Sequence, residues 1–126
     1  MPNVLLIDDD PQNLEVLGNL LSLEHIDFTP VQDPSALGEV LGHASKFDIV
    51  FLDLEFPDTD GYEILKYLKE EAGIKAPIVA CTVHLSELNN ASRQGFSGFV
   101  GKPIDPDRFS ERLARILSGD RVWELH

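Results

Sequence analysis

The sequence predicts an α/β protein, built on a parallel β-sheet with helices on both faces. Strand-like and helix-like segments alternate five times along the 126 residues. The run from Ile49 to Leu52 is wholly apolar, which is typical of a strand that is buried on both faces. This run and an earlier one, Val4 to Ile7, both end in aspartates, and open α/β sheets bind ligands at the carboxyl ends of their strands.

The length and composition fit a single folded domain. The chain is 43% hydrophobic, which favours a globular fold over a disordered chain. We expect residues 1–126 to form one domain, with a core over about residues 3–119 and a C-terminal tail over residues 120–126 that is polar apart from Val122, Trp123 and Leu125. The single cysteine, Cys81, excludes an internal disulfide and lies in a strand-like run, so a packed thiol is expected.

The net charge of the chain limits which kinds of molecule it can bind. The chain has 22 acidic and 10 basic residues, a formal net charge of -12. Phosphate backbones would be repelled, so we expect no direct binding of nucleic acid. The sequence has no signal peptide and no apolar run of membrane length, so we expect a cytoplasmic protein without membrane insertion.

The first half of the chain is expected to form two strand–helix pairs before the central strand. Each helix is expected to start at an Asp-Pro pair, at positions 10–11 and 33–34. In each pair the aspartate is the cap residue and the proline is the first residue of the helix. The second strand, near Ile26 to Val31, contains Pro30, which cannot donate to a ladder and therefore belongs at a sheet edge. Apolar residues at helical spacing form the buried stripes, namely Leu14, Leu17 and Leu21 in the first helix and Leu37, Val40, Leu41 and Ala44 in the second.

The second half repeats the alternation after a turn-rich loop at 57–61. Its expected elements are a helix with Ile64, Leu65 and Leu68 on one face, a strand from Ile78 to Cys81, a helix near Ser86 to Gln94, a short strand at Phe99-Val100, and a last helix from Asp105-Pro106 to Gly119. The helix near Ser86 to Gln94 should stop at Gly95 and has the thinnest apolar stripe. We therefore expect it to be the mobile element.

The strands deliver five chemically active side chains to one sheet edge: Asp8, Asp9, Asp53, Thr82 and Lys102. Three carboxylates within about 4–5 Å of each other repel by roughly 3–4 kcal/mol per pair at an effective dielectric near 20. They must be protonated, hydrated apart or bridged by a cation, and hard oxygen ligands suit Mg²⁺. With a hydroxyl and a lysine nearby, Asp53 could attack phosphorus and form an acyl phosphate. Asp10 is better explained as a helix cap.

These motifs resemble the receiver domain of two-component response regulators, of the CheY-like, stand-alone type. They are Leu-Ile-Asp-Asp-Asp-Pro at 6–11, Phe-Leu-Asp-Leu-Glu-Phe-Pro-Asp-Thr-Asp-Gly at 51–61, the strand that ends in Thr82, and Gly-Lys-Pro at 101–103. The resemblance covers nearly the whole chain. It implies a flavodoxin-like, doubly wound five-stranded parallel sheet with strand order 2-1-3-4-5. Edge positions for the second and fifth strands agree with that order.

The resemblance also implies a mechanism. Asp53 would accept phosphate from a sensor histidine kinase or a histidine phosphotransfer protein. Asp9, Asp53 and the backbone carbonyl of Glu55 would ligate Mg²⁺ directly, and Asp8 would act through metal-bound water. Thr82 matches the switch hydroxyl and Lys102 the lysine that pairs with the phosphoryl group.

By the same resemblance, Phe99 matches the aromatic switch position, and Pro103 would follow a cis bond. The output would be binding or release of a downstream effector protein at the face of the fourth helix, fifth strand and fifth helix. A homodimer that forms on phosphorylation is a further possible output. The protein would be a regulator that assists its own phosphorylation and dephosphorylation, not an enzyme in the ordinary sense.

Three positions depart from the family pattern or bear on phosphate lifetime. Val83 follows Thr82 where the family usually has a smaller residue, and its bulk could narrow the access of hydrolytic water. Glu55 and His84 lie two residues after Asp53 and Thr82, at positions that tune dephosphorylation in this family. We interpret these three as tuning residues, with neutral variation as the alternative.

Two other classes of function compete with the switch. A pseudo-receiver that docks partners without being phosphorylated would keep the fold but not need the acidic site. A Mg-dependent phosphatase with an aspartate nucleophile would carry that nucleophile after the first strand, where Asp8-Asp9-Asp10 lacks the expected Asp-x-Asp-x-Thr pattern. Reaction with acetyl phosphate or beryllofluoride separates the three.

Overall fold

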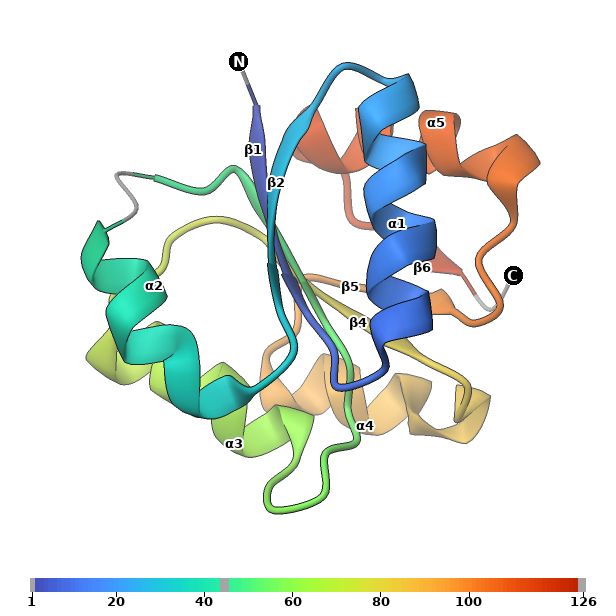
Figure 1. Cartoon of the computed structure of the whole chain (residues 1–126). Helices are drawn as coiled ribbons and strands as arrows, with labels where there is room; N and C mark the ends of the chain where they lie inside the picture. Colours follow the sequence, from blue (N-terminus) through green and yellow to red (C-terminus); the bar gives the residue numbers. More distant parts are fainter. Residues whose placement is uncertain (1, 44–45, 125–126) are drawn as a thin grey trace.

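The computed structural model describes residues 2–43 and 46–124 and shows a parallel sheet between two layers of helices (Figure 1). The elements in chain order are β1 (Asn3–Ile7), α1 (Pro11–Leu23), β2 (Asp27–Val31), the 3₁₀ turn η1 (Pro34–Ala36), α2 (Leu37–His43), β3 (Ile49–Leu52), α3 (Gly61–Lys66), the π-helical turn η2 (Tyr67–Glu71), β4 (Ile78–Thr82), the 3₁₀ turn η3 (Leu85–Glu87), α4 (Leu88–Gln94), β5 (Gly98–Gly101), α5 (Pro106–Leu117) and β6 (Trp123–Glu124).

The sheet order is β2-β1-β3-β4-β5-β6, and every pairing is parallel. The first five strands therefore take the predicted order 2-1-3-4-5. All four residues of β3 are buried, as its apolar run predicts for a central strand. β2, which contains Pro30, lies at the edge, where a missing backbone donor costs no ladder bond.

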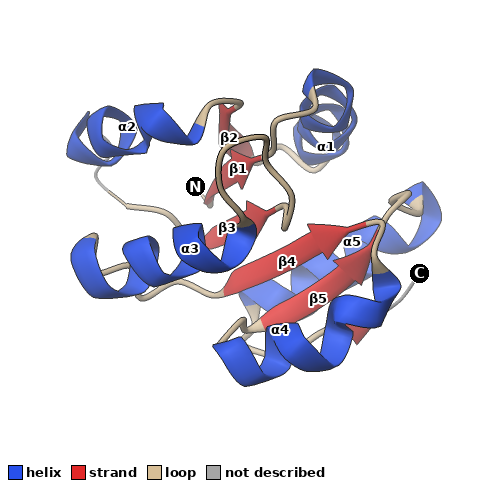
Figure 2. Cartoon of the chain, turned by 90° about the horizontal axis from the view of Figure 1, so that it is seen from below, coloured by secondary structure: helices blue, strands red, loops and turns tan. Residues whose placement is uncertain are grey.

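Helices cover both faces of the sheet (Figure 2). One face packs against α1 and α5, and the other against α2, α3 and α4. The buried hydrophobic residues of α1 are Leu14, Leu17 and Leu21, the stripe predicted for the first helix, and those of α5 are Phe109, Leu113 and Ile116. Within the described residues, no helix combines the length and the apolar character needed to cross a bilayer.

The predicted aspartate caps are present. Asp10 accepts a hydrogen bond from the backbone N–H of Gln12 at 2.9 Å, and Asp105 accepts one from Asp107 at 3.0 Å. Asp33 caps a 3₁₀ turn that precedes α2, so the second helix starts later than predicted. Ala44, the last residue of its predicted stripe, lies outside the described residues.

The helix near the fourth strand also starts with a 3₁₀ turn, η3, and becomes α-helical only at Leu88. It ends where predicted, because Gly95 adopts the left-handed conformation (φ 106°) that closes helices. Ala91 is the buried residue of α4, so the thin apolar stripe expected from the sequence is found. Cys81, in β4, is buried, and burial raises the pKa of its thiol to about 12.

The expected end of the core at about residue 119 is corrected by the structure. Gly119 turns the chain with φ +97°, and Val122 then enters the core with 1% exposure. The Val122 carbonyl accepts a hydrogen bond from the Phe99 N–H at 2.7 Å, and Trp123 begins β6 beside β5. β5 is therefore not an edge strand of the sheet, because β6 covers it. Residues 125–126 lie outside the described residues.

Candidate functional site

The candidate site lies where β1, β3, β4 and β5 end, at the lower end of the molecule in Figure 1. Backbone hydrogen bonds fix the residues that follow the strands. The N–H of Asp53 donates to the carbonyl of Ile7 at 3.0 Å, and the N–H of Asp8 donates to the carbonyl of Val31 at 3.1 Å. The sheet register thus holds the aspartates that leave β1 and β3 side by side.

Three carboxylates converge there. Asp8, Asp9 and Asp53 each offer an oxygen, and these oxygens lie within 4.8 Å of one another. Asp8 and Asp53 are almost fully buried, with 3% and 8% exposure, whereas Asp9 is half-buried. The expected convergence of carboxylates at this edge is therefore observed.

Lys102, which follows β5, reaches into this cluster. Its Nζ lies 2.7 Å from Oδ2 of Asp8 and 3.5 Å from Oδ2 of Asp53, and the residue is 7% exposed. Its backbone N–H donates to the carbonyl of Thr82 at 2.8 Å, and its peptide bond to Pro103 is cis, as the resemblance implied. The lysine spans the two buried carboxylates and offsets part of their charge.

The site shifts the acidity of two groups. Burial raises the pKa of Asp53 to about 6; the charge of Lys102 opposes this rise, and the charge of Asp8 adds to it. For Lys102, burial alone would lower the pKa, but the hydrogen bond to Asp8 and the nearby negative charges raise it above its usual value. The lysine therefore stays charged at neutral pH, while Asp53 is less acidic than an exposed aspartate.

The donor set fits a hard divalent cation. The cluster offers three carboxylates against one lysine, and like charges this close are costly without a further cation. Carboxylate oxygens with room for water are the ligands that Mg²⁺ prefers. Asp9, the most exposed of the three, leaves the cluster open to solvent on one side.

A cavity of about 540 Å³ opens over the cluster; Asp9, Asp53 and Lys102 lie in its wall. The loop after β3 lines it too, and so does Val83, which is 58% exposed. Two further lining residues, Asp10 and Asn13 at the start of α1, were not predicted to face a cavity. The residues that the loop contributes are Glu55, Phe56 and Pro57.

Glu55 and His84 meet beside this cavity. Oε1 of Glu55 lies 2.5 Å from Nε2 of His84, and both side chains are more than half exposed. The backbone N–H of His84 donates to Oγ1 of Thr82 at 3.1 Å. The loops after β3 and β4, which carry the three predicted tuning residues, are thus joined directly.

Thr82 and Phe99 lie deeper than the rest. Thr82 ends β4 and is fully buried, and it is paired in register with Gly101 of β5. Phe99 is fully buried in β5 and belongs to the core on the α2, α3 and α4 side. The structure brings Thr82 to Lys102 through the backbone but does not place Phe99 in the cavity wall.

Gly61, the last residue of the motif at 51–61, packs against the site in a way that the sequence patterns did not reveal. It begins α3, and its N–H donates to the carbonyl of Leu54 at 2.8 Å. A Cβ at this position would lie 2.5 Å from the backbone oxygen of Asp53 and 2.7 Å from Cα of Leu54. The sequence indicated only a turn at 57–61; that α3 begins against the backbone of Asp53 is visible only in the fold.

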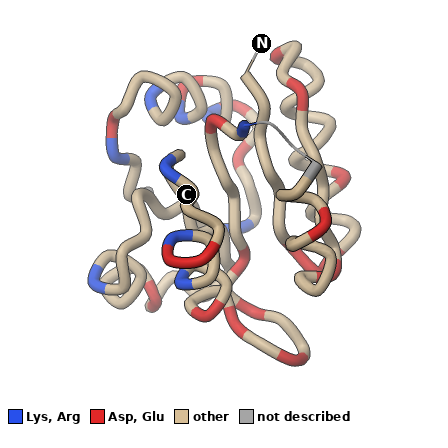
Figure 3. Tube along the Cα trace, turned by 90° about the vertical axis from the view of Figure 1, so that its left-hand side faces the viewer, with Lys and Arg blue, Asp and Glu red and all other residues tan. Residues whose placement is uncertain are grey.

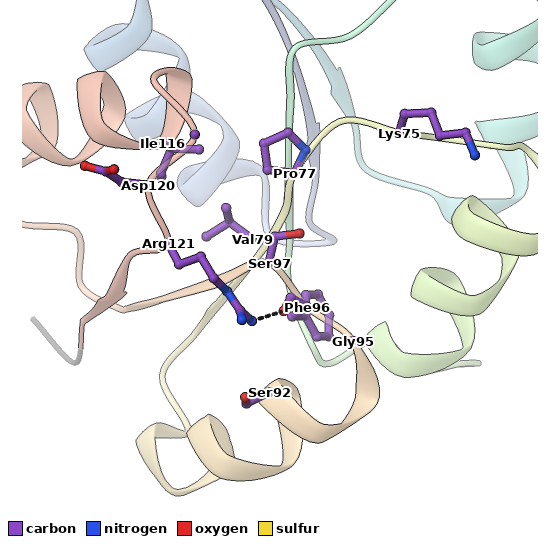
Figure 4. Close-up of a pocket in the computed structure, with 11 residues that line it drawn as sticks. Lys75, Pro77, Val79, Ser92, Gly95, Phe96, Ser97, Ile116, Asp120 and Arg121 are labelled. Atoms are coloured by element: carbon purple, nitrogen blue, oxygen red, sulfur yellow. Dashed lines mark hydrogen bonds between the residues drawn. The ribbon is translucent and has the colours of Figure 1, made fainter.

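A second hollow, of about 410 Å³, lies where β4 and β5 begin, at the other end of these strands from Thr82 and Lys102; Figure 4 shows the residues that line it. Arg121 extends across it, and its Nη2 donates to the carbonyl of Phe96 at 3.5 Å. The same guanidinium lies 5.1 Å from the ring centre of Trp123. Arg121 therefore fastens the C-terminal segment to the sheet, and the hollow holds none of the predicted site residues.

Comparison with known proteins gives a consistent result. The family described as response regulator receiver domain matches residues 4–114. The chain is similar to the two-component response regulator ORR5 of Oryza sativa subsp. japonica, with 28% identity over 92% of this chain and 89% of that protein. It is also similar to the osmosensing histidine protein kinase SLN1 of Saccharomyces cerevisiae, with 28% identity over 80% of this chain but only 9% of that kinase.

Among solved structures, a two-component response regulator from Clostridium difficile superimposes with a TM-score of 0.82 and 24% identity. The alignment covers 94% of this chain and 98% of that one. This likeness shows the fold.

Proposed function

The chain belongs to the response regulator receiver domain family, and we propose that it is a phosphorylation-controlled switch whose phosphoacceptor is Asp53. Receiver domains act in two-component systems as signalling regulators. The observation that carries the assignment of residues is the convergence of Asp8, Asp9 and Asp53 with Lys102 at one sheet edge. Asp53 is the central one, because it follows the fully buried strand β3 and lines the cavity.

The proposed reaction is transfer of a phosphoryl group from a phosphohistidine. A carboxylate oxygen of Asp53 forms a bond to phosphorus while the bond between phosphorus and the imidazole nitrogen breaks. The imidazole leaves with the bonding electron pair and takes up a proton. The donor is a sensor histidine kinase or a histidine phosphotransfer protein, a proposal supported by the similarity to a response regulator and to part of a histidine kinase.

We propose that Asp9, Asp53 and the backbone carbonyl of Glu55 hold Mg²⁺, with Asp8 acting through bound water. When bound, the ion offsets negative charge on the phosphoryl oxygens. The support is the set of carboxylate oxygens within 4.8 Å of one another.

Lys102 and Thr82 would respond to the phosphoryl group. Lys102 lies between Asp8 and Asp53, so a phosphoryl group on Asp53 offers it a further anionic partner. Thr82 offers a hydroxyl at the end of the neighbouring strand, where the backbone N–H of His84 now binds its oxygen. Turning this hydroxyl toward the phosphoryl group would disturb the loop that leads to α4.

The output proposed is a change at the face formed by α4, β5 and α5, read by a downstream effector protein or by a second copy of the domain. Phe99 is the proposed aromatic switch, and its ring is buried in this structure. Residues 1–126 would act as one cytoplasmic receiver domain.

We propose that Glu55, Val83 and His84 set the lifetime of the phosphorylated form. The exposed side chain of Val83 lines the cavity through which hydrolytic water reaches Asp53. A Val83→Ala variant should lose phosphate severalfold faster than the parent, as followed by the decay of labelled protein. Equal decay rates would contradict this role.

The test of the proposed function is incubation with Mg²⁺ and acetyl phosphate, followed by intact mass and peptide mapping. One phosphoryl group on Asp53, absent from Asp53→Asn and present in the matched variant Asp27→Asn, supports the switch. Turnover without a stable adduct would indicate a phosphatase. No modification, with no beryllofluoride binding either, would indicate a phosphorylation-independent docking module.

A further inference from the structure

A third hollow adjoins the site cavity and forms what we call the side groove. It lies between the loop after β2 and the loop after β3 and has a volume of about 570 Å³. Asp9, Phe56 and Pro57 belong to both the side groove and the site cavity. The two hollows are therefore neighbours with a shared wall, and a segment that covers Asp53 is close enough to extend into the groove.

The side groove is lined by both apolar and acidic side chains. Phe56, Pro57 and Pro34 contribute apolar surface, and Phe56 is only partly buried. Asp9 and Asp58 contribute carboxylates. None of the residues that line the groove is a lysine or an arginine. Asp58 is exposed and takes part in none of the ion pairs found among the described residues, so its charge is available to a partner.

The charge of the whole chain is asymmetric in the same sense. Residues 1–45 contain no lysine or arginine, and the ten basic residues lie from Lys46 to Arg121. Figure 3 shows acidic positions without basic ones along the right-hand side of the view, and a red-marked loop at the lower end. A partner that approaches Asp53 from the β2 side therefore meets a negative surface.

The negative surface around Asp53 repels an incoming phosphoryl group, and positive charges on the donor would reduce this repulsion. The phosphoryl group is an anion, and it must approach a cluster of carboxylates of which Lys102 offsets only part. Cations placed on the donor next to its phosphohistidine would reduce the repulsion. The side groove offers them carboxylates directly beside the site cavity.

We propose that the side groove is the docking site for a basic segment of the protein phosphodonor, one that carries lysine or arginine and an apolar side chain close to its phosphohistidine. This inference rests on the proposed function and adds the chemistry of the partner. The apolar side chain lies against Phe56 and Pro57, and the basic side chains pair with Asp58 and its acidic neighbours. The reaction at Asp53 is the transfer already described.

Two synthetic phosphohistidine peptides test the groove. They share a leucine one turn from the phosphohistidine and differ in two flanking residues, both lysine or both glutamate. The transfer rate of each, divided by the rate with acetyl phosphate, should favour the lysine peptide by about tenfold at low salt, as expected for two surface ion pairs. The preference should shrink as salt is added.

Variants of Asp58 test whether the preference for the lysine peptide arises in the side groove. The preference should fall in Asp58→Asn and vanish or reverse in Asp58→Lys, whereas Glu71→Lys, the same change at an exposed position in η2, should keep it. Equal rates for both peptides, transfer from neither, or equal preferences in Asp58→Lys and Glu71→Lys would overturn the proposal while acetyl phosphate still labels Asp53. Failure of acetyl phosphate itself would instead remove the proposed function.

Discussion

Lys102 and Asp53 show how burial and charge compete at a single residue. Both lie within the sheet edge with less than a tenth of their surface exposed. Burial disfavours the charged form of each, and each charge favours the other. For Asp53 burial prevails and its pKa rises to about 6, whereas for Lys102 the surrounding acidic groups prevail and its pKa rises too.

The raised pKa of Asp53 predicts how stability depends on pH. In the metal-free protein Asp53 binds a proton more tightly when folded than when unfolded, where its pKa is near 3.8. Its contribution to stability is therefore complete below about pH 4 and is lost as the pH rises through about 6, by up to about 3 kcal/mol.

Urea unfolding in the presence of a chelator, from pH 4 to pH 7, measures this effect as the difference between the parent and Asp53→Asn. We expect the Asn variant to gain stability relative to the parent as the pH rises. The matched variant Asp27→Asn should show no such trend. A difference between parent and Asp53→Asn that does not change with pH would contradict the prediction.

Gly61 sets the position of the phosphoacceptor through the backbone. Two of the three atoms nearest to an added Cβ are backbone atoms of Asp53 and Leu54, at 2.5 and 2.7 Å, and backbone cannot move aside as a flexible side chain can. We expect Gly61→Ala to slow phosphorylation by acetyl phosphate by tenfold or more. Adding Leu54→Ala should not restore the rate.

The matched control for Gly61 is Gly42→Ala, in α2, where no atom of the described residues lies within 4 Å of an added Cβ. That change should preserve the rate and stabilise the helix by up to about 1 kcal/mol. The rates are compared in samples shown to be folded by circular dichroism. A normal rate in Gly61→Ala would show that the loop adapts without moving Asp53.

At the scale of elements, α4 is held by few apolar contacts and by specific polar links. Ala91 is its buried residue. The hydroxyl of Tyr62 in α3 donates to Oε1 of Glu87 in η3 at 2.6 Å. The rings of Tyr62 and Phe96 pack edge to face, with their centres 5.9 Å apart. Burial and this hydrogen bond raise the pKa of Tyr62 to about 12. α3 thereby restrains the segment that leads into α4.

Removing this link should loosen α4. Tyr62→Phe loses a hydrogen bond to a carboxylate, which costs about 1–2 kcal/mol. Hydrogen exchange should become faster over residues 85–94, because this segment has little apolar burial to compensate. Tyr67→Phe, on the next turn, removes a hydroxyl without a hydrogen bond among those found for the described residues, so it should leave this exchange unchanged. Unaltered exchange in Tyr62→Phe would contradict the role of the link.

At the scale of the whole molecule, the sheet extends one strand beyond the five that organise the site. β6 lies beside β5, the strand that leads to Lys102. Val122, just before β6, is buried with residues of α1 and α5. The C-terminal segment is therefore part of the core that supports the site.

Truncating the side chain of Val122 tests whether the C-terminal segment contributes to the stability of the core. Val122→Ala should lower the free energy of unfolding by about 2 kcal/mol, the cost of removing buried methyl groups and leaving a cavity. Val16→Ala is the same chemical change in α1 at a residue that is 46% exposed, and it should alter stability by less than about 0.5 kcal/mol. Urea unfolding of both variants makes the comparison, and equal effects would mean that Val122 does not contribute to the core.

The strand–helix alternation, the aspartate caps and the set of residues at the carboxyl edge could all be predicted from sequence patterns. These are encoded locally, because apolar periodicity reports burial, Asp-Pro reports a helix start, and parallel strands deliver their next residues to one edge. The sequence alone therefore allowed five residues to be assigned to one site, namely Asp8, Asp9, Asp53, Thr82 and Lys102.

The contacts between these parts depend on the packing of the whole chain and were visible only in the fold. The fold placed Lys102 between Asp8 and Asp53, joined Glu55 to His84, set Gly61 against the backbone of Asp53, and turned Val122 into the core. None of these contacts has a local signature, since each depends on the path of the chain between distant residues. Sequence patterns report which residues are buried or exposed, whereas the partner of a buried group is fixed by packing.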